Sequence, residues 1–315
     1  MTLDNIKEEI EKAESIVIVT HENPDGDAIG SSTAMYIALK RMGKDVDVII
    51  PEVPRTYTFL PYTDEIKKQV NDKKYDLAIS LDAANMQLLG ISKKYFEESK
   101  TKVVIDHHSI NSMYGDYNFV NPDAPACAQV LIVVLGFLGI EIDVEIGTCL
   151  LTGIITDTGG FQYSGVTTET FEFAASLLNK GVKVSEIYKK AMNTKTMSSF
   201  KLYRQALSRM EFLEDGKIAF TYTTDDDMKK YSAEVGDREG IVETGRNIEG
   251  VEVSCYLRET EKGYKISLRS NEKVNVAKVC FAFGGGGHVK AAGCNINEPL
   301  EVAKEQIIKE IKKYL

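Results

Sequence analysis

The sequence predicts an α/β protein with a mostly parallel sheet in its first domain and a smaller α/β domain after it. In the first half of the chain, short apolar β-branched runs alternate with helix-like segments, a pattern typical of βαβ units. In the last third, strand-like segments follow one another with alternating apolar and polar residues. The boundary falls within helical sequence, which predicts a first domain over 1–184, a helical linker over 185–210 and a second domain over 211–315.

The elements of the first half follow in order along the chain. The strands are predicted from apolar or alternating runs at Ser15–Thr20, Asp45–Ile50, Tyr75–Leu81 and Lys102–Ile105. The helices are predicted at Ala28–Met42 before Gly43, at Val144–Thr156 with Asp143 as N-cap, at Thr168–Asn179 and at Ser185–Met192.

The remaining elements belong to the linker and the second domain. Ser198–Glu211 is predicted as a connecting helix. Three alternating segments predict strands at Gly216–Thr223, Val251–Arg258 and Tyr264–Arg269. A helix from about Leu300 closes the chain.

Composition and charge exclude several classes of protein. With 315 residues, 43% hydrophobic and 27% charged, the chain is globular rather than disordered or fibrous. A net charge of −9 argues against a long duplex nucleic acid held by its phosphates, although basic side chains outnumber acidic ones between Arg246 and Lys290. The longest apolar run, Val130–Ile140, is too short to span a bilayer, and the N-terminal segment has no secretory signal. Five cysteines without a C-x-x-C pair argue against a disulfide framework. We therefore expect a cytoplasmic protein with reduced thiols and no membrane partner.

Acidic and imidazole side chains follow three of the predicted strands and one predicted helix. Because ligands bind outside the carboxyl ends of parallel strands, we expect these side chains to meet at one edge of the sheet. So many carboxylates repel one another, and bound cations would relieve this repulsion. Oxygen ligands mixed with imidazole favour Mn²⁺, Mg²⁺ or Fe²⁺ over a thiolate zinc site. The residues are His21, Asp25, Asp27, Asp82, Asp106, His107 and His108, with Asp157 at the helix end.

Each segment also has a simpler interpretation when it is taken alone. Asn23-Pro24-Asp25-Gly26 is a good turn sequence, Asp82 could be an N-cap, and the glycine run Gly284–Gly287 could be a flexible loop. The joint occurrence favours function, because all four histidines of the chain lie in these segments.

Five motifs together resemble those of the DHH phosphoesterase superfamily. They are H-x-x-P-D-x-D-A-x-G-S from His21, the Asp82 that follows a strand, D-H-H at Asp106–His108, T-D-T-G around Asp157, and G-G-G-G-H-x-x-A-A-G from Gly284. The last block is similar to the DHH-associated domain, and the chain most resembles short bacterial enzymes with oligoribonuclease (nanoRNase) and 3′-phosphoadenosine 5′-phosphate (pAp) phosphatase activity. The glycine-rich block argues against the family II pyrophosphatases.

The resemblance implies a two-metal centre, usually with Mn²⁺, in a cleft between the domains. His21 and Asp25 would bind one ion, and Asp27, His107 and Asp157 the other, with Asp82 bridging them. Asp106 would orient an imidazole, and His108 would act on the scissile phosphate. In the second domain, a terminal phosphate would be held by the backbone of Gly285, Gly286 and Gly287, by His288 and Arg269, and by Arg246 or Arg258.

The expected reaction is hydrolysis of short oligoribonucleotides to mononucleotides and of pAp to AMP and phosphate. Relatives of similar length hydrolyse cyclic di-AMP or its linear product pApA, so that substrate stays an alternative, as does a metal-dependent nucleotide-binding module without turnover. Dinucleotides are among the expected partners, and a homodimer stays open.

Overall fold

The computed structural model describes residues 2–71 and 73–315, so Met1 of the expected first domain and Asp72 lie outside the described residues. The chain divides into two compact units, Met1–Thr194 and Lys195–Leu315. The segment expected as a linker is divided between them, because its first residues belong to the first unit and the rest to the second.

The first unit contains a five-stranded sheet in the order β2-β1-β3-β4-β5, and all its strand pairs are parallel. The predicted parallel α/β class is therefore confirmed. The strands are β1 Ser15–Val19, β2 Asp45–Ile49, β3 Leu77–Leu81, β4 Thr101–Asp106 and β5 Tyr117–Val120. The last of these was not predicted.

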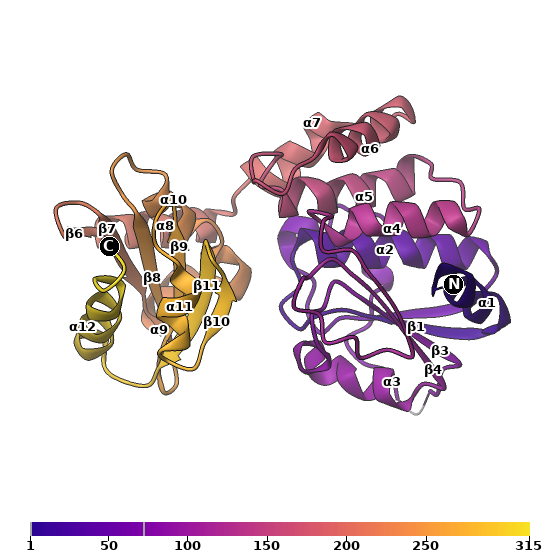
Figure 1. Cartoon of the computed structure of the whole chain (residues 1–315), viewed down its shortest axis with the longest axis horizontal. Helices are drawn as coiled ribbons and strands as arrows, with labels where there is room; N and C mark the ends of the chain where they lie inside the picture. Colours follow the sequence, from indigo (N-terminus) through magenta and orange to yellow (C-terminus); the bar gives the residue numbers. More distant parts are fainter. Residues whose placement is uncertain (1, 72) are drawn as a thin grey trace. The chain divides into compact units, whose positions relative to one another are not determined.

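Helices cover both faces of this sheet (Figure 1). One face packs against α1, α2, α4 and α5, and the other packs against α3, where Phe96 is fully buried. The α-helices are α1 Thr2–Lys12, α2 Gly26–Arg41, α3 Lys93–Glu98, α4 Cys127–Phe137, α5 Val144–Asp157, α6 Thr168–Asn179 and α7 Val184–Ile187. The 3₁₀-helices are η1 Arg55–Tyr57, η2 Thr63–Glu65 and η3 Met86–Ser92, and η4 Tyr188–Asn193 is a π-helix.

Helices α2 and α5 approach each other closely because glycines face the contact. A Cβ at Gly30 would lie 2.4 Å from the carbonyl oxygen of Cys149, and one at Gly153 would lie 2.5 Å from Oδ1 of Asp27. The glycine of the D-x-D-A-x-G-S motif is thus a packing requirement. The contact fixes Asp27, at the start of α2, against the helix that ends at Asp157.

The second unit contains a six-stranded mixed sheet in the order β10-β11-β9-β8-β7-β6. Only β7 and β8 pair in parallel. The strands are β6 Glu211–Leu213, β7 Ile218–Thr223, β8 Val253–Thr260, β9 Gly263–Ser270, β10 Gly286–His288 and β11 Ala291–Ile296. The expected second α/β domain is present.

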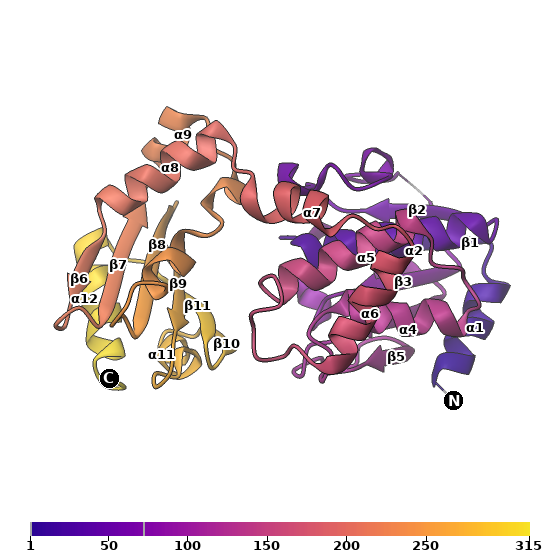
Figure 2. The same cartoon turned by 90° about the horizontal axis from the view of Figure 1, so that it is seen from above.

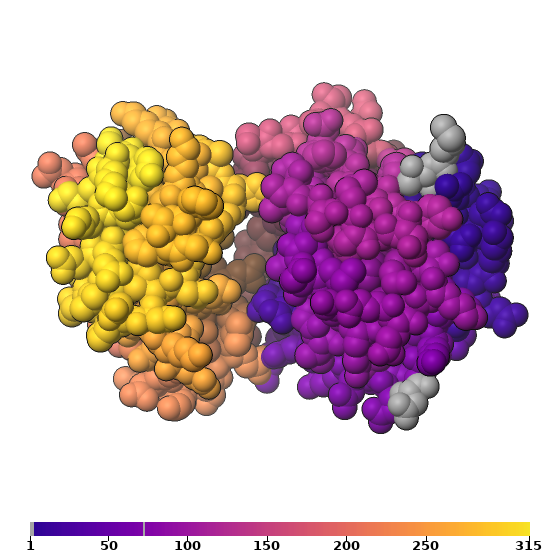
Figure 3. All heavy atoms as spheres, turned by 60° about the horizontal axis from the view of Figure 1, so that its bottom comes forward, coloured from indigo at the N-terminus to yellow at the C-terminus, as the bar shows by residue number. Residues whose placement is uncertain are grey.

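Two sets of helices flank this sheet on opposite faces (Figure 2). Helices α11 and α12 enclose the larger apolar core, and α8 and α10 enclose a smaller one around Tyr256. The helices are α8 Met197–Ser208, α9 Asp225–Tyr231, η5 Val235–Arg238, α10 Ile241–Arg246, α11 Val276–Phe281 and α12 Leu300–Ile311. The first and last helices, α1 and α12, both lie at the surface (indigo and yellow in Figure 3).

Most predicted elements differ from the structure by one or two residues at an end, and three predictions differ by more than that. The expected helix Ser185–Met192 is a short α-helix followed by the π-helix η4. The expected helix Ser198–Glu211 ends at Ser208, because Glu211 already belongs to β6 and pairs with β7. Part of the glycine run is not a loop, because Gly286–His288 form strand β10 against β11. Over residues 2–71 and 73–315, no helix combines the length and apolar character needed to cross a membrane.

Candidate metal centre

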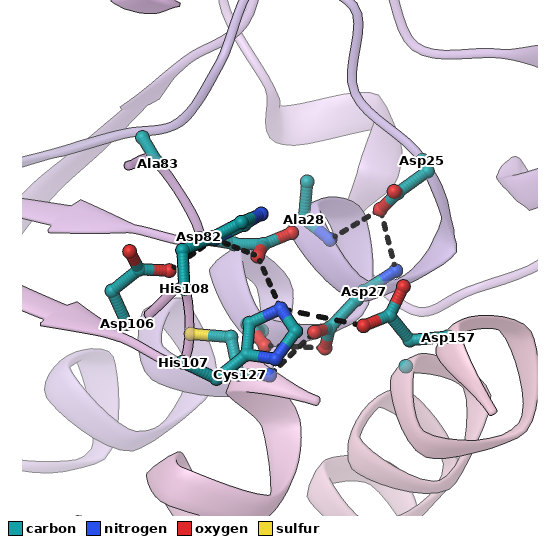
Figure 4. Close-up of polar contacts among 12 residues, drawn as sticks. Asp25, Asp27, Ala28, Asp82, Ala83, Asp106, His107, His108, Cys127 and Asp157 are labelled. Carbon is teal, nitrogen blue, oxygen red and sulfur yellow. Dashed lines mark hydrogen bonds and ion pairs between the residues drawn. The ribbon is translucent and has the colours of Figure 1, made fainter. Parts of the chain in front are cut away.

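The acidic and imidazole residues singled out in the first unit converge at the carboxyl edge of its sheet (Figure 4). Strands β1, β3 and β4 are neighbours, so the residues that follow them emerge side by side. Asp82 follows β3, and Asp157 reaches the same place from the end of α5. Three groups have ligand atoms close enough to hold a metal ion: His21, Asp25 and Asp82; Asp27, His107 and Asp157; and Asp82, Asp106, His107 and His108.

Asp82 occupies the centre of this cluster. Its Oδ2 lies 3.7 Å from Nε2 of His21, and its Oδ1 lies 3.5 Å from Nε2 of His107. The carboxylate is buried, and Oδ1 has no hydrogen-bond partner among the described residues. Asp82 also adopts a left-handed backbone conformation with φ of 54°, which costs energy in a residue other than glycine. A buried carboxylate oxygen without a donor fits a site for a cation.

Asp25 and Asp27 are held in place by backbone donors. Oδ1 of Asp25 caps α2 by accepting the N–H groups of Asp27 and Ala28 at 3.0 and 3.1 Å. Asp27 is fully buried and accepts the N–H groups of Cys127 and Ala128, the first two residues of α4, at 2.5 and 2.9 Å. Asp27 therefore caps α4 from a distant part of the sequence while it faces the cluster.

Hydrogen bonds at Nδ1 orient the two adjacent imidazoles. Nδ1 of His107 lies 3.2 Å from the carbonyl oxygen of Ala124, so it donates there and leaves Nε2 as the ligand atom. Nε2 of His107 lies 3.3 Å from Asp157. Nδ1 of His108 lies 2.8 Å from Oδ1 of Asp106, a buried carboxylate, so His108 is the imidazole that Asp106 orients.

Burial and mutual repulsion set the protonation of the cluster. Burial and the charge of Asp82 raise the pKa of Asp27 well above its usual range. Burial opposes ionisation of Asp82 as well, but His107 and His21 outweigh it and lower the pKa of Asp82. Burial lowers the pKa of His107, whereas the stronger attraction of Asp82 and Asp157 raises it to about 10. Without a cation, the cluster thus retains protons to balance its carboxylates, and a divalent ion could replace them.

The sequence-predicted phosphate-binding residues lie in the second unit, where the structure brings only some of them together. Arg269 on β9 and His288 on β10 both flank Ala291 of β11, and paired residues project to the same face of a sheet. Arg269 donates to Oε1 of Glu243 at 3.1 Å.

The remaining phosphate-binding candidates occupy other positions. Arg258 pairs with Lys265, four residues along β9 from Arg269, and is therefore not beside it. Arg246 is the last residue of α10. Gly285 precedes β10, whereas Gly286 and Gly287 belong to it.

Three residues at these sites were not identified from the sequence. Nδ2 of Asn111 donates to Oδ2 of Asp106 at 2.6 Å and so supports the Asp106–His108 pair. The N–H groups of Cys127 and Ala128 hold Asp27. The position of Asn111 five residues after Asp106 is a local signal, but the contact of α4 with Asp27 spans about a hundred residues and has no sequence signal.

Two family descriptions match this chain. "DHH family, N-terminal domain" matches residues 15–154, and "DHHA1 domain" matches residues 214–315. The bifunctional oligoribonuclease and PAP phosphatase NrnA of Thermus thermophilus is 35% identical over 303 residues, which covers 95% of this chain and 90% of that protein. The protein of the same name from Bacillus subtilis is 24% identical, with 90% of each chain covered.

Two solved structures are similar over nearly the whole length. An exopolyphosphatase-related protein from Bacteroides fragilis has a TM-score of 0.90 and 30% identity, with 99% of this chain and 96% of that chain covered. The exonuclease RecJ bound to manganese has a TM-score of 0.56 and 14% identity, with 100% of this chain and 95% of that chain covered, and this likeness concerns the fold alone.

Proposed function

This chain belongs to the DHH family and carries its DHHA1 domain, and on that basis we propose that it hydrolyses short oligoribonucleotides to mononucleotides and pAp to AMP and phosphate. DHH-family enzymes are metal-dependent phosphoesterases, so the chain is a hydrolase of phosphoester bonds. The observation that carries the proposal is the convergence of three groups of potential ligands on Asp82, whose buried Oδ1 has no donor among the described residues.

Two divalent cations, with Mn²⁺ as the first choice and Mg²⁺ or Fe²⁺ as alternatives, would occupy this cluster. His21 and Asp25 would hold one ion, and Asp27, His107 and Asp157 would hold the other. Asp82 would bind both ions. The three groups of potential ligands support this division, as does the position of the two oxygens of Asp82, which face different imidazoles. When bound, such a pair acidifies a water molecule and neutralises phosphoryl oxygens.

His108 is the proposed proton donor to the oxygen that leaves the phosphorus. Burial lowers the pKa of His108, but the hydrogen bond to Asp106 and the charges of Asp106 and Asp82 together outweigh burial and raise it, which favours the protonated ring. Asp106 accepts from Nδ1 and keeps Nε2 of His108 available to the substrate. Asn111 holds Asp106 in turn. This chain of hydrogen bonds supports a donor role for His108 without metal binding.

Substrates are proposed to be short, with a terminal phosphate bound in the second unit. Arg269 and His288 share one face of the sheet beside the glycine strand β10, whose three residues are exposed. The chain has a net charge of −9 and no tryptophan, which disfavours a long track for single strands. Turnover is expected to fall beyond about five nucleotides, and Arg269→Ala is expected to raise KM most for substrates with a terminal phosphate.

The test is hydrolysis of pAp and of a 5′-phosphorylated trinucleotide by protein that has been dialysed against EDTA and then given Mn²⁺, Mg²⁺ or Fe²⁺. We expect release of AMP and phosphate from pAp and of mononucleotides from the trinucleotide, with Asp82→Asn as the inactive control. Absence of products with every cation would refute the proposal and favour a binding module without turnover.

Cyclic di-AMP and pApA are the second candidate substrates. The relatives described above are named for oligoribonucleotides and PAP, and their names do not mention a cyclic dinucleotide. A parallel assay with cyclic di-AMP ranks the two candidates directly, and higher kcat/KM for the cyclic dinucleotide than for pAp would reverse our order.

A further inference from the structure

One face of the second sheet carries two arginines, Arg258 and Arg269, at separate positions. Arg258 lies near the end of β8, where it pairs with Thr223 of β7 and Lys265 of β9. Arg269 lies four residues from Lys265 on β9, so the side chains of Arg258 and Arg269 project from the same face. At about 3.3 Å per residue, the two positions are separated by about 13 Å along the strands.

Arg258 is half-buried but lacks a counter-ion. Among residues 2–71 and 73–315, its guanidinium has no hydrogen bond or ion pair. Burial and the nearby positive charge of Arg238 lower the pKa of Arg258. An arginine in such a place is costly, because a desolvated charge needs a partner and the positive charge of Arg238 repels it.

Arg238, the last residue of η5, is also incompletely satisfied. Its side chain is 13% exposed, and its Nε is buried without a hydrogen-bond partner in the described part of the chain. Its ion pair with Asp225 joins Nη2 and Oδ1 at 3.8 Å, which is too long for a hydrogen bond. Asp225 follows Thr223, the strand partner of Arg258, by two residues, which places Arg238 near Arg258. Arg258 has no ion pair and Arg238 has this one at 3.8 Å, so the two guanidinium groups together retain a net positive charge.

We propose that Arg238 and Arg258 form an anion site that binds a backbone phosphate of an oligonucleotide at some distance from the terminal phosphate held by Arg269. Guanidinium groups bind phosphate oxygens through paired N–H donors, and the phosphate would supply the acceptor that Nε of Arg238 lacks. The separation of about 13 Å between the positions of Arg258 and Arg269 exceeds the axial rise of ~3.4 Å between successive phosphates of a stacked strand. The two sites would therefore bind phosphates that are not successive along the strand. The inference rests on the proposed function, since it names a second subsite for the same substrates.

The test uses Arg258→Gln and Arg238→Gln, with Arg204→Gln as the matched control. Arg204 is an exposed arginine on α8, so its replacement removes the same charge elsewhere in the unit. kcat/KM is measured for pAp and for 5′-phosphorylated oligonucleotides of two to five residues. We expect the ratio of kcat/KM for the tetranucleotide to that for pAp to fall about tenfold in both test variants and to stay at the wild-type value in the control.

A binding measurement without turnover separates this inference from the proposed hydrolysis. The affinity of the full chain for a labelled 5′-phosphorylated tetranucleotide is followed by fluorescence anisotropy in EDTA over a range of salt concentrations. Arg258→Gln is expected to weaken binding and to reduce the slope of log affinity against log salt by about one. This result does not depend on hydrolysis, whereas failure of the proposed function would appear as absence of products from the wild-type protein.

Free inorganic phosphate is the other source of the same chemistry. Binding of inorganic phosphate is measured by calorimetric titration of the wild-type protein and of Arg258→Gln. If only the wild-type protein binds phosphate, while the ratio of kcat/KM for the tetranucleotide to that for pAp is the same in both, the site binds free phosphate. That outcome overturns the oligonucleotide assignment. Equal losses for pAp and the tetranucleotide, or losses matched by Arg204→Gln, also overturn it. Because Arg258→Gln removes a repulsive charge, its Tm is expected to equal or exceed that of the wild type, and a lower Tm would indicate a structural role instead.

Discussion

Replacing Gly153 by alanine tests whether the close packing of α2 and α5 positions the metal centre. Gly153 lies in the middle of α5, four residues before Asp157. The added Cβ would lie 2.5 Å from Oδ1 of Asp27 and 2.7 Å from the Cβ of Ala128. A Cβ atom essentially never has a contact below 3.0 Å, so the helices or the carboxylate must move by about 0.5 Å.

The carboxylate of Asp27 has little freedom to move. Its oxygens accept the N–H groups of Cys127 and Ala128 and the hydroxyl of Ser31. Overpacking of this kind costs about 1–3 kcal/mol, and alanine returns about 1 kcal/mol through its higher helix propensity. The net loss of stability is therefore expected to be at most about 2 kcal/mol. Displacing a ligand together with its hydrogen bonds should weaken metal binding by about 10–100-fold.

The assay compares Gly153→Ala with Gly147→Ala on the same helix. At Gly147 a Cβ would meet the side-chain methyl groups of Val182 and Leu177 at 2.8 and 3.3 Å, away from the metal centre. Mn²⁺ affinity is measured by calorimetry after dialysis against EDTA, and stability by thermal unfolding. Both variants should remain folded, and only Gly153→Ala should lose affinity. Wild-type Mn²⁺ affinity and turnover in Gly153→Ala would refute the argument that this contact sets the ligand geometry.

Three further predictions concern the cluster and the stability of the first unit. Asp82→Ala should reduce bound metal more than Asp25→Ala, because a bridging ligand serves both ions, and elemental analysis that finds two ions in Asp82→Ala would contradict the bridge. His108→Ala should lower kcat by about 10²–10⁴-fold and leave the metal content normal, whereas His107→Ala should lower both kcat and the metal content. Equal loss of metal in the two variants would disprove their different roles. Asp47 is buried; burial raises its pKa, but two lysines and a tyrosine outweigh this and lower the pKa to about 2. Its stabilisation of about 2 kcal/mol is therefore present above pH 4 and lost as the pH falls towards 2. Urea unfolding should show Asp47→Asn less stable than wild type at pH 7 by that amount, with a smaller difference at pH 3, and a constant difference would count against the ion pairs.

The sequence predicted the edge of the first sheet because its signals are local. A buried strand followed directly by aspartate or histidine identifies both the strand and the direction in which its last residues emerge. β1, β3 and β4 each carry such a signal, and in the structure the ligand atoms of these residues lie in three groups close to one another. Asp143 was identified as the N-cap of α5 for the same reason, and its carboxylate does accept the N–H of Ile146.

Helix α4 was missed because the features that define it are tertiary. Its residues are apolar on nearly every side, so they show no helical periodicity. Its N-cap is Ala126, whose methyl group cannot accept a hydrogen bond, and the carboxylate of Asp27 accepts the N–H groups at the start of the helix instead. Strand β10 was missed because glycine generally disfavours strands. Here glycine is required, because Gly287, with φ of 140°, passes so close to Ala291 that a Cβ would lie 2.5 Å from the carbonyl oxygen of Ala291. Arg238 was not identified because its charge acts on Arg258 only in the folded chain.

The outer strands of the second sheet have a consequence for how this protein behaves at high concentration. An exposed strand edge offers a row of backbone donors and acceptors to other chains, which promotes aggregation. Here both outer strands, β6 and β10, have only three residues, and one of them consists of two glycines and a histidine. An incoming strand would gain few hydrogen bonds at either edge and little side-chain contact at β10. The short, exposed edge at β10 therefore makes a poor template for the stacking of further strands.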